Sequence, residues 1–310
     1  MMADLTLVIL AAGIGSRFGG DKQLAALGPN GETMLELSLQ SAYRAGFTKA
    51  VLVIRPELVD TLDTLLADKL PDDFVCDYCM QSLDDLPAAV IKYADLALRK
   101  KPWGTAHALW SARHQVAGPM AVINADDFYG DSAFVLLAEG LLNSIDDWMM
   151  VAYPIKLTLS DNGGVNRGLC QVENGKLIDV AEWLDIQSHA NGLVGTLEGK
   201  RASIGNDALV SMTCWGFKAD IFTAIETELS RFILQQGRLA KSECYLPSVV
   251  QARLHPGADS HTSTDARGVY VSVAQEAWYG VTYPEDAEWV KRKLLEKLAA
   301  AQMHLHGKPE

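Results

Sequence analysis

The feature that most constrains this chain is an abrupt change from an apolar run to a glycine-rich loop within residues 7–22, LVILAAGIGSRFGGDK. The apolar run, residues 7–10, is typical of a strand buried in a parallel sheet. The loop after it contains four glycines, Gly13, Gly15, Gly19 and Gly20. Glycine adopts positive φ and has no Cβ, so such a loop can bring backbone N–H groups close to a ligand. Because Arg17 and Lys22 add two cations, we expect the loop to hold a polyanion such as a triphosphate.

Two better-known glycine loops are excluded by the spacing. The dinucleotide-binding fingerprint, G-x-G-x-x-G, would need a third glycine where Phe18 stands. The P-loop, G-x-x-x-x-G-K-[ST], would need a glycine before Lys22 and a serine or threonine after it, but the neighbours are Asp21 and Gln23. The purely structural alternative for this stretch is a glycine-rich turn between a strand and a helix.

The remaining pattern, A-A-G-x-G-S-R followed by a lysine, resembles the signature of the nucleotidyltransferase family, the nucleoside-diphosphate-sugar pyrophosphorylases. The resemblance implies an α/β fold of Rossmann-like, glycosyltransferase-A-type topology, with a mixed, mostly parallel sheet flanked by helices. It also implies that Arg17 and Lys22 are catalytic. Five residues of the same stretch would contact the nucleotide: Ala11, Ala12, Gly13, Gly15 and Ser16.

Composition limits the classes of function. The chain has 310 residues, 49% of them hydrophobic and 21% charged, as in an ordinary globular protein with a substantial core. Its formal net charge of −12 argues against nucleic-acid and membrane-surface partners, because both are polyanions. A small anionic substrate stays compatible, since nearby cations can outweigh a distant field. No apolar run reaches membrane-spanning length and the start of the chain lacks a basic region, so we expect a cytoplasmic protein.

The five cysteines are scattered along the chain. Cys76 and Cys79 form a C-x-x-C pair in a strand-like run, with no second pair or nearby histidine to complete a zinc site. A redox pair would be expected at the start of a helix instead. We therefore expect buried or half-buried thiols.

A β-α-β unit follows the glycine-rich loop, which predicts a parallel sheet. Thr33 is expected to cap a helix that ends at Gly46, and residues 50–54 form the next strand. Further elements are expected as a helix over 57–70, a strand over 73–80, a helix over 104–114 and a strand from 121. We expect one nucleotidyltransferase domain, 1–310, made of a nucleotide-binding half (1–147), a sugar-phosphate-binding half (148–230) and a C-terminal strand with helices (231–310).

The segment KPWGTAHA, residues 101–108, opens the helix expected over 104–114. Its structural interpretation is a capped helix start after an X-Pro bend. It also resembles the G-T-A segment of the same family, which implies that Gly104 and Thr105 approach the nucleobase; the family assignment adds Gln81 to this nucleotide site. His107 is expected to pack or to form hydrogen bonds, because no partner histidine or cysteine lies at metal-ligand spacing.

The segment AVINADDFYG, residues 121–130, is a strand that runs directly into the paired acids Asp126 and Asp127. Ligands in open α/β sheets collect at the carboxyl ends of strands, and Mg²⁺ takes one or two carboxylates plus substrate phosphates. Since a strand alternates faces, only one acid is expected to point into the site. Resemblance to the family's G-D-x-x-F segment implies that Asp126 is the metal ligand, that Asp127 orients it or caps the next helix, and that Asn124 contacts substrate. The alternative is a solvated turn.

The middle of the chain is expected to meet the second substrate. Asn174-Gly175 lies between two alternating segments and predicts a hairpin. Gly168 and Glu182 fit the family's Y-G-V…E-K-P pattern, which contacts the sugar and its phosphate. However, Trp183 stands in place of the lysine, and an aromatic ring can stack on a sugar but cannot pair with a phosphate.

Three cations could replace that lysine, and the sequence does not rank them: Lys156, Arg167 and Arg201. Farther along, SMTCWGF (211–217) resembles the family's N-x-G-x-Y-x-F strand, which implies a substrate contact for Ser211 and places Thr213 at the family's small position.

The last third is expected to contain a helix over about 218–236, a second helical stretch broken at Pro247, a polar loop over 255–268, and a strand followed by a long amphipathic helix. The family's W-x-D-x-G-T motif corresponds to Trp278 and the residues after it, but Gly280 takes the place of the metal-binding acid. Glu276 is the nearest acid and so a candidate second metal ligand. The ending G-V-T-Y-P-E-D also resembles that of cytidylyltransferases.

Together these features predict a Mg²⁺-dependent sugar-1-phosphate nucleotidyltransferase of the EC 2.7.7 type, in nucleotide-sugar biosynthesis. Its partners would be a nucleoside triphosphate and a sugar 1-phosphate, and a homo-oligomer is compatible with the sequence. Two alternatives stay open: a cytidylyltransferase for a non-sugar phosphate or phosphonate, and a non-catalytic regulator that binds nucleotide or sugar phosphate on the same fold.

Overall fold

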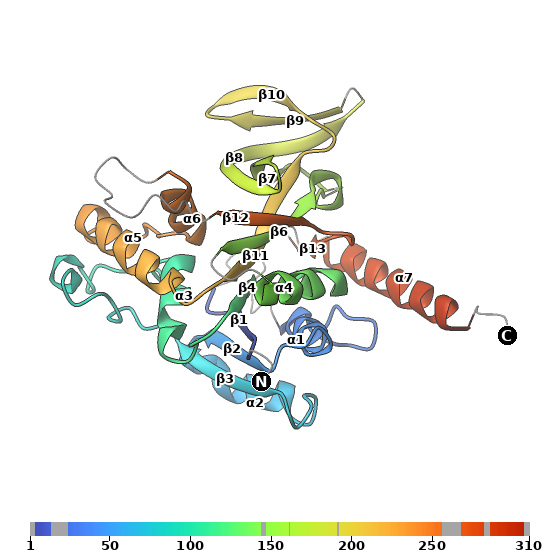
Figure 1. Ribbon diagram of the computed structural model, residues 1–310, viewed down its shortest axis with the longest axis horizontal. Helices are drawn as coiled ribbons and strands as arrows, with labels where there is room; N and C mark the ends of the chain where they lie inside the picture. Colours follow the sequence, from blue (N-terminus) through green and yellow to red (C-terminus); the bar gives the residue numbers. More distant parts are fainter. Residues whose placement is uncertain are drawn as a thin grey trace.

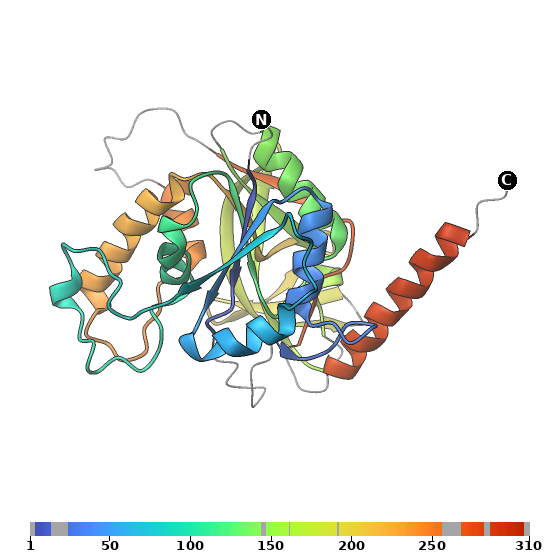
Figure 2. The same cartoon turned by 90° about the horizontal axis from the view of Figure 1, so that it is seen from below.

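The computed structural model describes residues 4–13, 24–143, 147–160, 162–190, 192–255, 268–281 and 286–306, with side chains as far as residue 299. Within these ranges the chain forms an α/β fold, in which a large mixed sheet carries helices on both faces (Figures 1 and 2). No helix in the described part of the chain is both long and apolar enough to cross a membrane.

The first half of the chain builds the parallel part of the sheet. Its strands are β1 (Thr6–Leu10), β2 (Lys49–Ile54), β3 (Val75–Met80) and β4 (Met120–Asn124). β1 lies between β2 and β4, and β3 pairs with β2, all in parallel. The expected β-α-β unit is therefore confirmed, because α1 (Met34–Arg44) connects β1 to β2.

The start and the end of α1 lie where the sequence predicts them. Thr33 and Glu36 form a reciprocal capping box, in which the Thr33 hydroxyl accepts from the Glu36 N–H and the Glu36 carboxylate accepts from the Thr33 N–H. Gly46, just beyond the helix, has φ +94°, which an L side chain would disfavour. The helix expected over 57–70 is shorter, with α2 at Val59–Leu66 preceded by a 3₁₀ turn at Pro56–Leu58.

The second half of the chain extends the sheet with mostly antiparallel strands. They are β6 (Trp148–Pro154), β7 (Val165–Glu173), β8 (Lys176–His189), β9 (Gly192–Leu197), β10 (Lys200–Ile204), β11 (Leu209–Phe217) and β12 (Val269–Val273). Among them only β12 and β6 pair in parallel. Asn174 and Gly175, both at positive φ, form the β7–β8 turn, so the hairpin is confirmed.

The strand order is β10-β9-β8-β12-β6-β11-β4-β1-β2-β3, and β7 pairs with both β11 and β8. The sheet is mixed, as expected, but its mostly parallel character holds only for the first half. The reason is that β11 pairs antiparallel with β4, and the strand pairs beyond it are antiparallel except for β12 with β6. A separate two-stranded sheet joins β5 (Asp127–Phe128) to β13 (Tyr279–Gly280).

Helices cover the two faces as strand alternation requires. The side chains of Leu7 and Ile9 on β1 pack in a core beneath α1, α2 and α4 (Asp131–Asn143). Val8 points the other way, into a core beneath α3 (Thr105–Ser111), α5 (Ile221–Gln236) and α6 (Leu246–Leu254). α7 (Asp286–His306) extends away from the body, as Figure 1 shows.

Two sequence expectations need adjustment here. The helix expected over 104–114 is α3 continued by a 3₁₀ turn at Ala112–His114. Pro247 does not break a helix but lies in the first turn of α6, where its missing N–H would have no intrahelical partner in any case. The cysteines are buried or half-buried, as expected, and burial raises the pKa of the Cys79 thiol to about 11.

Candidate active site

The carboxyl ends of β1 and β4 lie side by side at one edge of the sheet. Ala11, which directly follows β1, donates its N–H to Val53 O at 2.8 Å, and Ala125, which follows β4, donates to Leu10 O at 3.2 Å. Ala12 is buried and Gly13 is exposed where the loop begins. The polypeptide therefore brings the start of the glycine-rich loop next to the paired acids.

The rest of that loop lies outside the described residues. This applies to Gly15, Ser16, Arg17 and Lys22, whose catalytic and nucleotide-binding roles therefore stay predictions.

A cavity of about 300 Å³ opens beside this edge. All four residues assigned to the second substrate line it, and they come from four strands: Asn124 from β4, Gly168 from β7, Glu182 from β8 and Ser211 from β11. The register explains three of them, because Gly168 lies opposite Glu182 on one side and opposite Ser211 on the other. Residues far apart in sequence thus form one row on the cavity wall.

The absence of a side chain at Gly168 leaves space between the neighbouring side chains of this row. A Cβ at this position would lie 2.8 Å from Val180 Cγ1, and would point between Ser211 Cβ at 3.8 Å and Glu182 Oε2 at 3.9 Å. Any larger residue would have to displace the Val180 side chain.

β11 makes an irregular step at the cavity. Its pairing with β6 shifts between Ser211 and Trp215, and Thr213 within this step has φ +55°. A threonine in the left-handed region is strained, and such strain concentrates at functional sites. Thr213 lines the cavity, together with Asn166, which the sequence did not single out. No motif in the sequence marked Asn166 as a cavity residue, because its position at the cavity depends on the register of β7.

The structure separates the two acids after β4. Asp127, in β5, is buried and lines the cavity, and its Oδ2 accepts hydrogen bonds from Asn124 Nδ2 at 3.0 Å and Tyr129 OH at 3.3 Å. Asp126 is half-buried in the turn between β4 and β5 and does not line that cavity. One acid of the pair lines the cavity, as expected, but it is Asp127, and the cause is the turn at residues 125–126 rather than strand alternation. Asp127 does not cap a helix, since α4 begins only at Asp131.

Charges of both signs meet in the cavity. Burial lowers the pKa of Arg167 to about 10, while the Asp127, Glu182 and Asp286 carboxylates oppose that shift, so the guanidinium stays charged at neutral pH. Partial burial raises the pKa of Glu182, and the charge of Arg167 works in the opposite direction.

The three residues assigned to the nucleobase lie together. Gln81, just after β3, directs Nε2 toward Gly104 O at 3.4 Å and His107 Nδ1 at 3.0 Å. Gly104 has φ +102°, and a Cβ there would lie 2.5 Å from Cys244 O, so packing alone already requires glycine. The Thr105 hydroxyl accepts from Leu246 N–H at 2.8 Å and fixes the start of α6. A structural role for Gly104 and Thr105 is therefore evident, and nucleotide binding stays a prediction.

His107 is a buried hydrogen-bonding residue, in agreement with the sequence. Because Gln81 Nε2 is a donor, His107 Nδ1 accepts, and His107 Nε2 donates to Asp85 O at 3.0 Å. Burial lowers the pKa of His107 from 6.5 to about 4, so the ring is neutral at physiological pH.

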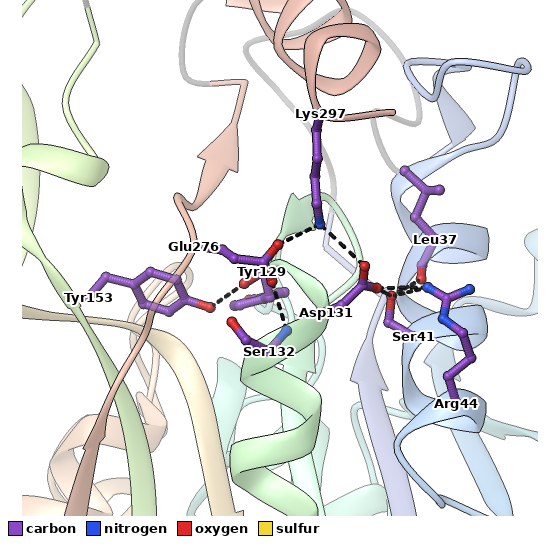
Figure 3. A network of polar contacts seen from close by, with 9 residues as sticks. All are labelled: Leu37, Ser41, Arg44, Tyr129, Asp131, Ser132, Tyr153, Glu276 and Lys297. Carbon is purple, nitrogen blue, oxygen red and sulfur yellow. Dashed lines mark hydrogen bonds and ion pairs between the residues drawn. The ribbon is translucent and has the colours of Figure 1, made fainter. Parts of the chain in front are cut away.

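Glu276 has a different role from the metal ligand expected of it. Its carboxylate pairs with Lys297 of α7 at 2.8 Å and accepts from the Ser132 N–H in the first turn of α4 at 2.7 Å. Figure 3 shows Lys297 reaching both Glu276 and Asp131, which in turn pairs with Arg44 of α1 at 2.7 Å. Glu276 therefore links α4 to α7, and the neighbouring Asp131 extends the same network to α1. In the described residues, no group of three potential ligands of the His, Cys, Asp or Glu type could hold a metal.

Comparison with known families finds a likeness in the first part of the chain. Residues 7–148 match the model of the MobA-like NTP transferase domain. These residues are therefore similar to an NTP transferase domain. No curated protein matches the chain by sequence.

Solved structures extend the likeness to the whole length of the chain. A protein named as a glucose-1-phosphate thymidylyltransferase from Bacillus anthracis, in complex with sucrose, has a TM-score of 0.63 at 14% identity, covering 94% of this chain and 96% of that one. The inositol-1-phosphate CTP transferase from T. maritima has a TM-score of 0.58 at 14% identity, covering 96% and 98%. A UDP-glucose pyrophosphorylase complexed with UDP-glucose has a TM-score of 0.59 at 15% identity, covering 96% and 100%. At these identities the likeness establishes the fold, which this chain thus shares with the three proteins.

The pKa of His107 predicts a loss of stability in mild acid. The folded state favours the neutral ring, so its contribution to stability is complete above about pH 6.5 and is lost as the pH falls toward 4. Urea unfolding should show wild type losing about 2 kcal/mol more than H107Q between pH 7 and pH 5. The exposed His114 supplies the control, since H114Q should behave as wild type; an equal pH dependence in wild type and H107Q would contradict the assignment.

The contacts of Glu276 predict a structural effect without a metal effect. E276A removes the α4 cap and the ion pair to Lys297, so the free energy of unfolding should fall by about 1–2 kcal/mol. The Mg²⁺ concentration that gives half-maximal pyrophosphate release should not change. E296A, which removes an exposed ion pair on α7, is the matched control and should alter neither quantity noticeably. A raised Mg²⁺ requirement in E276A alone would return Glu276 to the metal site.

Proposed function

We propose that the chain is a sugar-1-phosphate nucleotidyltransferase, which converts a nucleoside triphosphate and a sugar 1-phosphate into a nucleoside-diphosphate sugar and pyrophosphate. The observation that carries the proposal is the cavity that Asn124, Gly168, Glu182 and Ser211 line, next to the end of β1 in a region similar to an NTP transferase domain. In this proposal residues 1–310 act as one domain. That it works in the cytoplasm and forms homo-oligomers stays a prediction.

The nucleotide half would bind the triphosphate at the sheet edge. The glycine-rich loop would offer backbone N–H groups beyond Ala11, and Gln81 with the neighbouring Gly104 would offer polar groups to the base. The second half would present the sugar phosphate from the row formed by Gly168, Glu182 and Ser211. Glu182 would accept hydrogen bonds from sugar hydroxyl groups, because a carboxylate accepts only.

The reaction needs positioning and charge neutralisation more than covalent help. A phosphate oxygen of the acceptor forms a bond to the α-phosphorus, and the bond from that phosphorus to the bridging oxygen of the pyrophosphate breaks. Negative charge develops on the leaving pyrophosphate, where Arg17 and Lys22 would stabilise it. No nucleophilic serine, cysteine or histidine is required.

The residues present fit a magnesium ion bound with substrate. Mg²⁺ is commonly held by one or two carboxylates plus substrate phosphates, and Asp126 lies in the turn where β4 ends beside β1. Asp126 would hold the ion, and Asp127, fixed by Asn124 and Tyr129, would supply negative charge nearby. When bound, Mg²⁺ neutralises phosphate charge at the reacting centre.

A second candidate is a cytidylyltransferase for a non-sugar phosphate. It is favoured by Trp183, which replaces the lysine of the sugar-phosphate pattern, and by the similarity of the fold to a CTP transferase for inositol 1-phosphate. Both candidates share the reaction at phosphorus and differ in the base and the alcohol.

A pyrophosphate-release assay tests both candidates. The four nucleoside triphosphates are each combined with glucose 1-phosphate, inositol 1-phosphate and phosphocholine in the presence of Mg²⁺. Turnover with a sugar phosphate supports the main proposal, and turnover only with CTP and a non-sugar phosphate supports the second. Nucleotide binding without pyrophosphate release from any pair would contradict both and favour a regulator.

Three substitutions test the catalytic assignment. R17A and K22A should each lower turnover by about 10²–10³-fold, as expected when a charge on the leaving group is left unstabilised, with little change in melting temperature. D126N should remove the Mg²⁺-dependent activity, measured as pyrophosphate release against Mg²⁺ concentration. Near-normal activity in both loop variants would contradict the loop assignment, whereas D126N with unchanged metal dependence would move the ligand to Asp127 or elsewhere.

A further inference from the structure

The proposed function leaves one group of the acceptor without a partner. A sugar 1-phosphate or alcohol phosphate brings a dianionic phosphate into the cavity, whose wall carries the carboxylates of Asp127 and Glu182. On β8 the residue after Glu182 is Trp183, which has no charge to offer. A cation must therefore come from another element if a phosphate is to be held there.

Position separates the three cations that the sequence could not rank. Lys156 is exposed in the 3₁₀ turn at Ile155–Leu157 and does not line the cavity. Arg201 is exposed on β10, outside the cavity, with Asp185 at 3.9 Å. Arg167 lines the cavity and lies directly opposite Trp183 in the β7–β8 ladder. The cation that β8 lacks is thus present on the paired strand.

The guanidinium of Arg167 is held in place. Its Nε donates to Thr158 Oγ1 at 3.3 Å, one terminal nitrogen donates to Thr158 O, and the other donates to Asn166 O at 2.8 Å. Its Cζ lies over the Trp278 ring, 5.0 Å from the centroid. Because the group is fixed before a ligand arrives, little side-chain entropy remains to be lost on binding.

The same hydrogen bonds leave donors for a ligand. A guanidinium has five N–H groups, and the bonds to Thr158 and Asn166 in the described part of the chain use three of them. The two that remain belong to the two terminal nitrogens, one to each, and both can donate to phosphate oxygens. Arg167 is also buried, with 9% of its surface exposed, so its charge is weakly screened by solvent.

We propose that Arg167 binds the phosphate of the acceptor substrate, taking the place of the lysine that Trp183 replaces. This inference rests on the proposed function. It narrows the acceptor to phosphate esters small enough for the cavity, held at the phosphate by Arg167 and at hydroxyl groups by Glu182. Arg167 is thus a substrate-binding residue that determines specificity for the charged end of the acceptor.

The test compares R167K, R167Q and the control R201Q in the full chain. The probes are glucose 1-phosphate, inositol 1-phosphate and inorganic phosphate. Binding of each probe is measured by the broadening of its ³¹P NMR line. Mg²⁺ with each nucleoside triphosphate is followed separately by thermal shift. We expect R167Q to weaken binding of the phosphate probes by about 10- to 100-fold, R167K to weaken it less, and R201Q to match wild type. Nucleotide binding should stay within about twofold of wild type in all three.

The outcomes distinguish this inference from the proposed function. Phosphate binding in R167Q equal to wild type, or equal loss of phosphate and nucleotide binding in R167Q and R167K, would overturn the inference alone. Wild type that binds nucleotide but none of the phosphate probes would overturn it too. Wild type that binds no nucleotide would contradict the proposed function itself. If R167Q does not fold, R167K decides: selective weakening of the phosphate probes supports the assignment, and any other result overturns it.

Discussion

The change of partner along β11 is the constraint on which the candidate site depends. The first residues of this strand pair with β7, the last ones pair with β4, and β6 accompanies both parts. One strand thus joins the parallel half, which carries the glycine-rich loop, to the antiparallel half, which carries Gly168 and Glu182. The irregular step around Thr213 lies where the partner changes, and the cavity opens there.

The binding of anionic substrates has to overcome the negative charge of the chain. The chain as a whole carries a formal charge of −12, yet the proposed substrates are anions. Binding must therefore depend on a few cations placed close to the ligand rather than on the field of the whole molecule. In the described residues the cavity has Arg167 as such a cation, and the loop would add Arg17 and Lys22. Asp127 and Glu182 then limit where a phosphate can lie within the cavity.

Local patterns in the sequence were sufficient for most of the helices and strands. The capping box at Thr33, the hairpin at Asn174-Gly175 and the burial of His107 each depend on neighbours in sequence or on simple burial, and each is confirmed. Asn124, Gly168, Glu182 and Ser211 came from a family resemblance, and the structure places them together, although their roles await a ligand.

What the sequence could not give depends on contacts between distant segments. Glu276 looked like a metal ligand because it precedes Trp278, but only the approach of α7 and α4 shows its partners, Lys297 and Ser132. Lys156, Arg167 and Arg201 could not be ranked as phosphate-binding cations from the sequence. Their ranking depends on the β7–β8 register, which places Arg167 opposite Trp183. The sequence also did not predict how much of the sheet is antiparallel. That extent depends on which distant strands become neighbours in the sheet.

A crystal structure of the full chain with Mg²⁺, a non-hydrolysable nucleoside triphosphate and glucose 1-phosphate tests the central claim most directly. The account predicts the triphosphate along the loop that begins at Ala11, with its α-phosphorus facing the cavity and the ion beside Asp126. A triphosphate bound elsewhere on the molecule, or directed away from the cavity between Asn124 and Glu182, would contradict it.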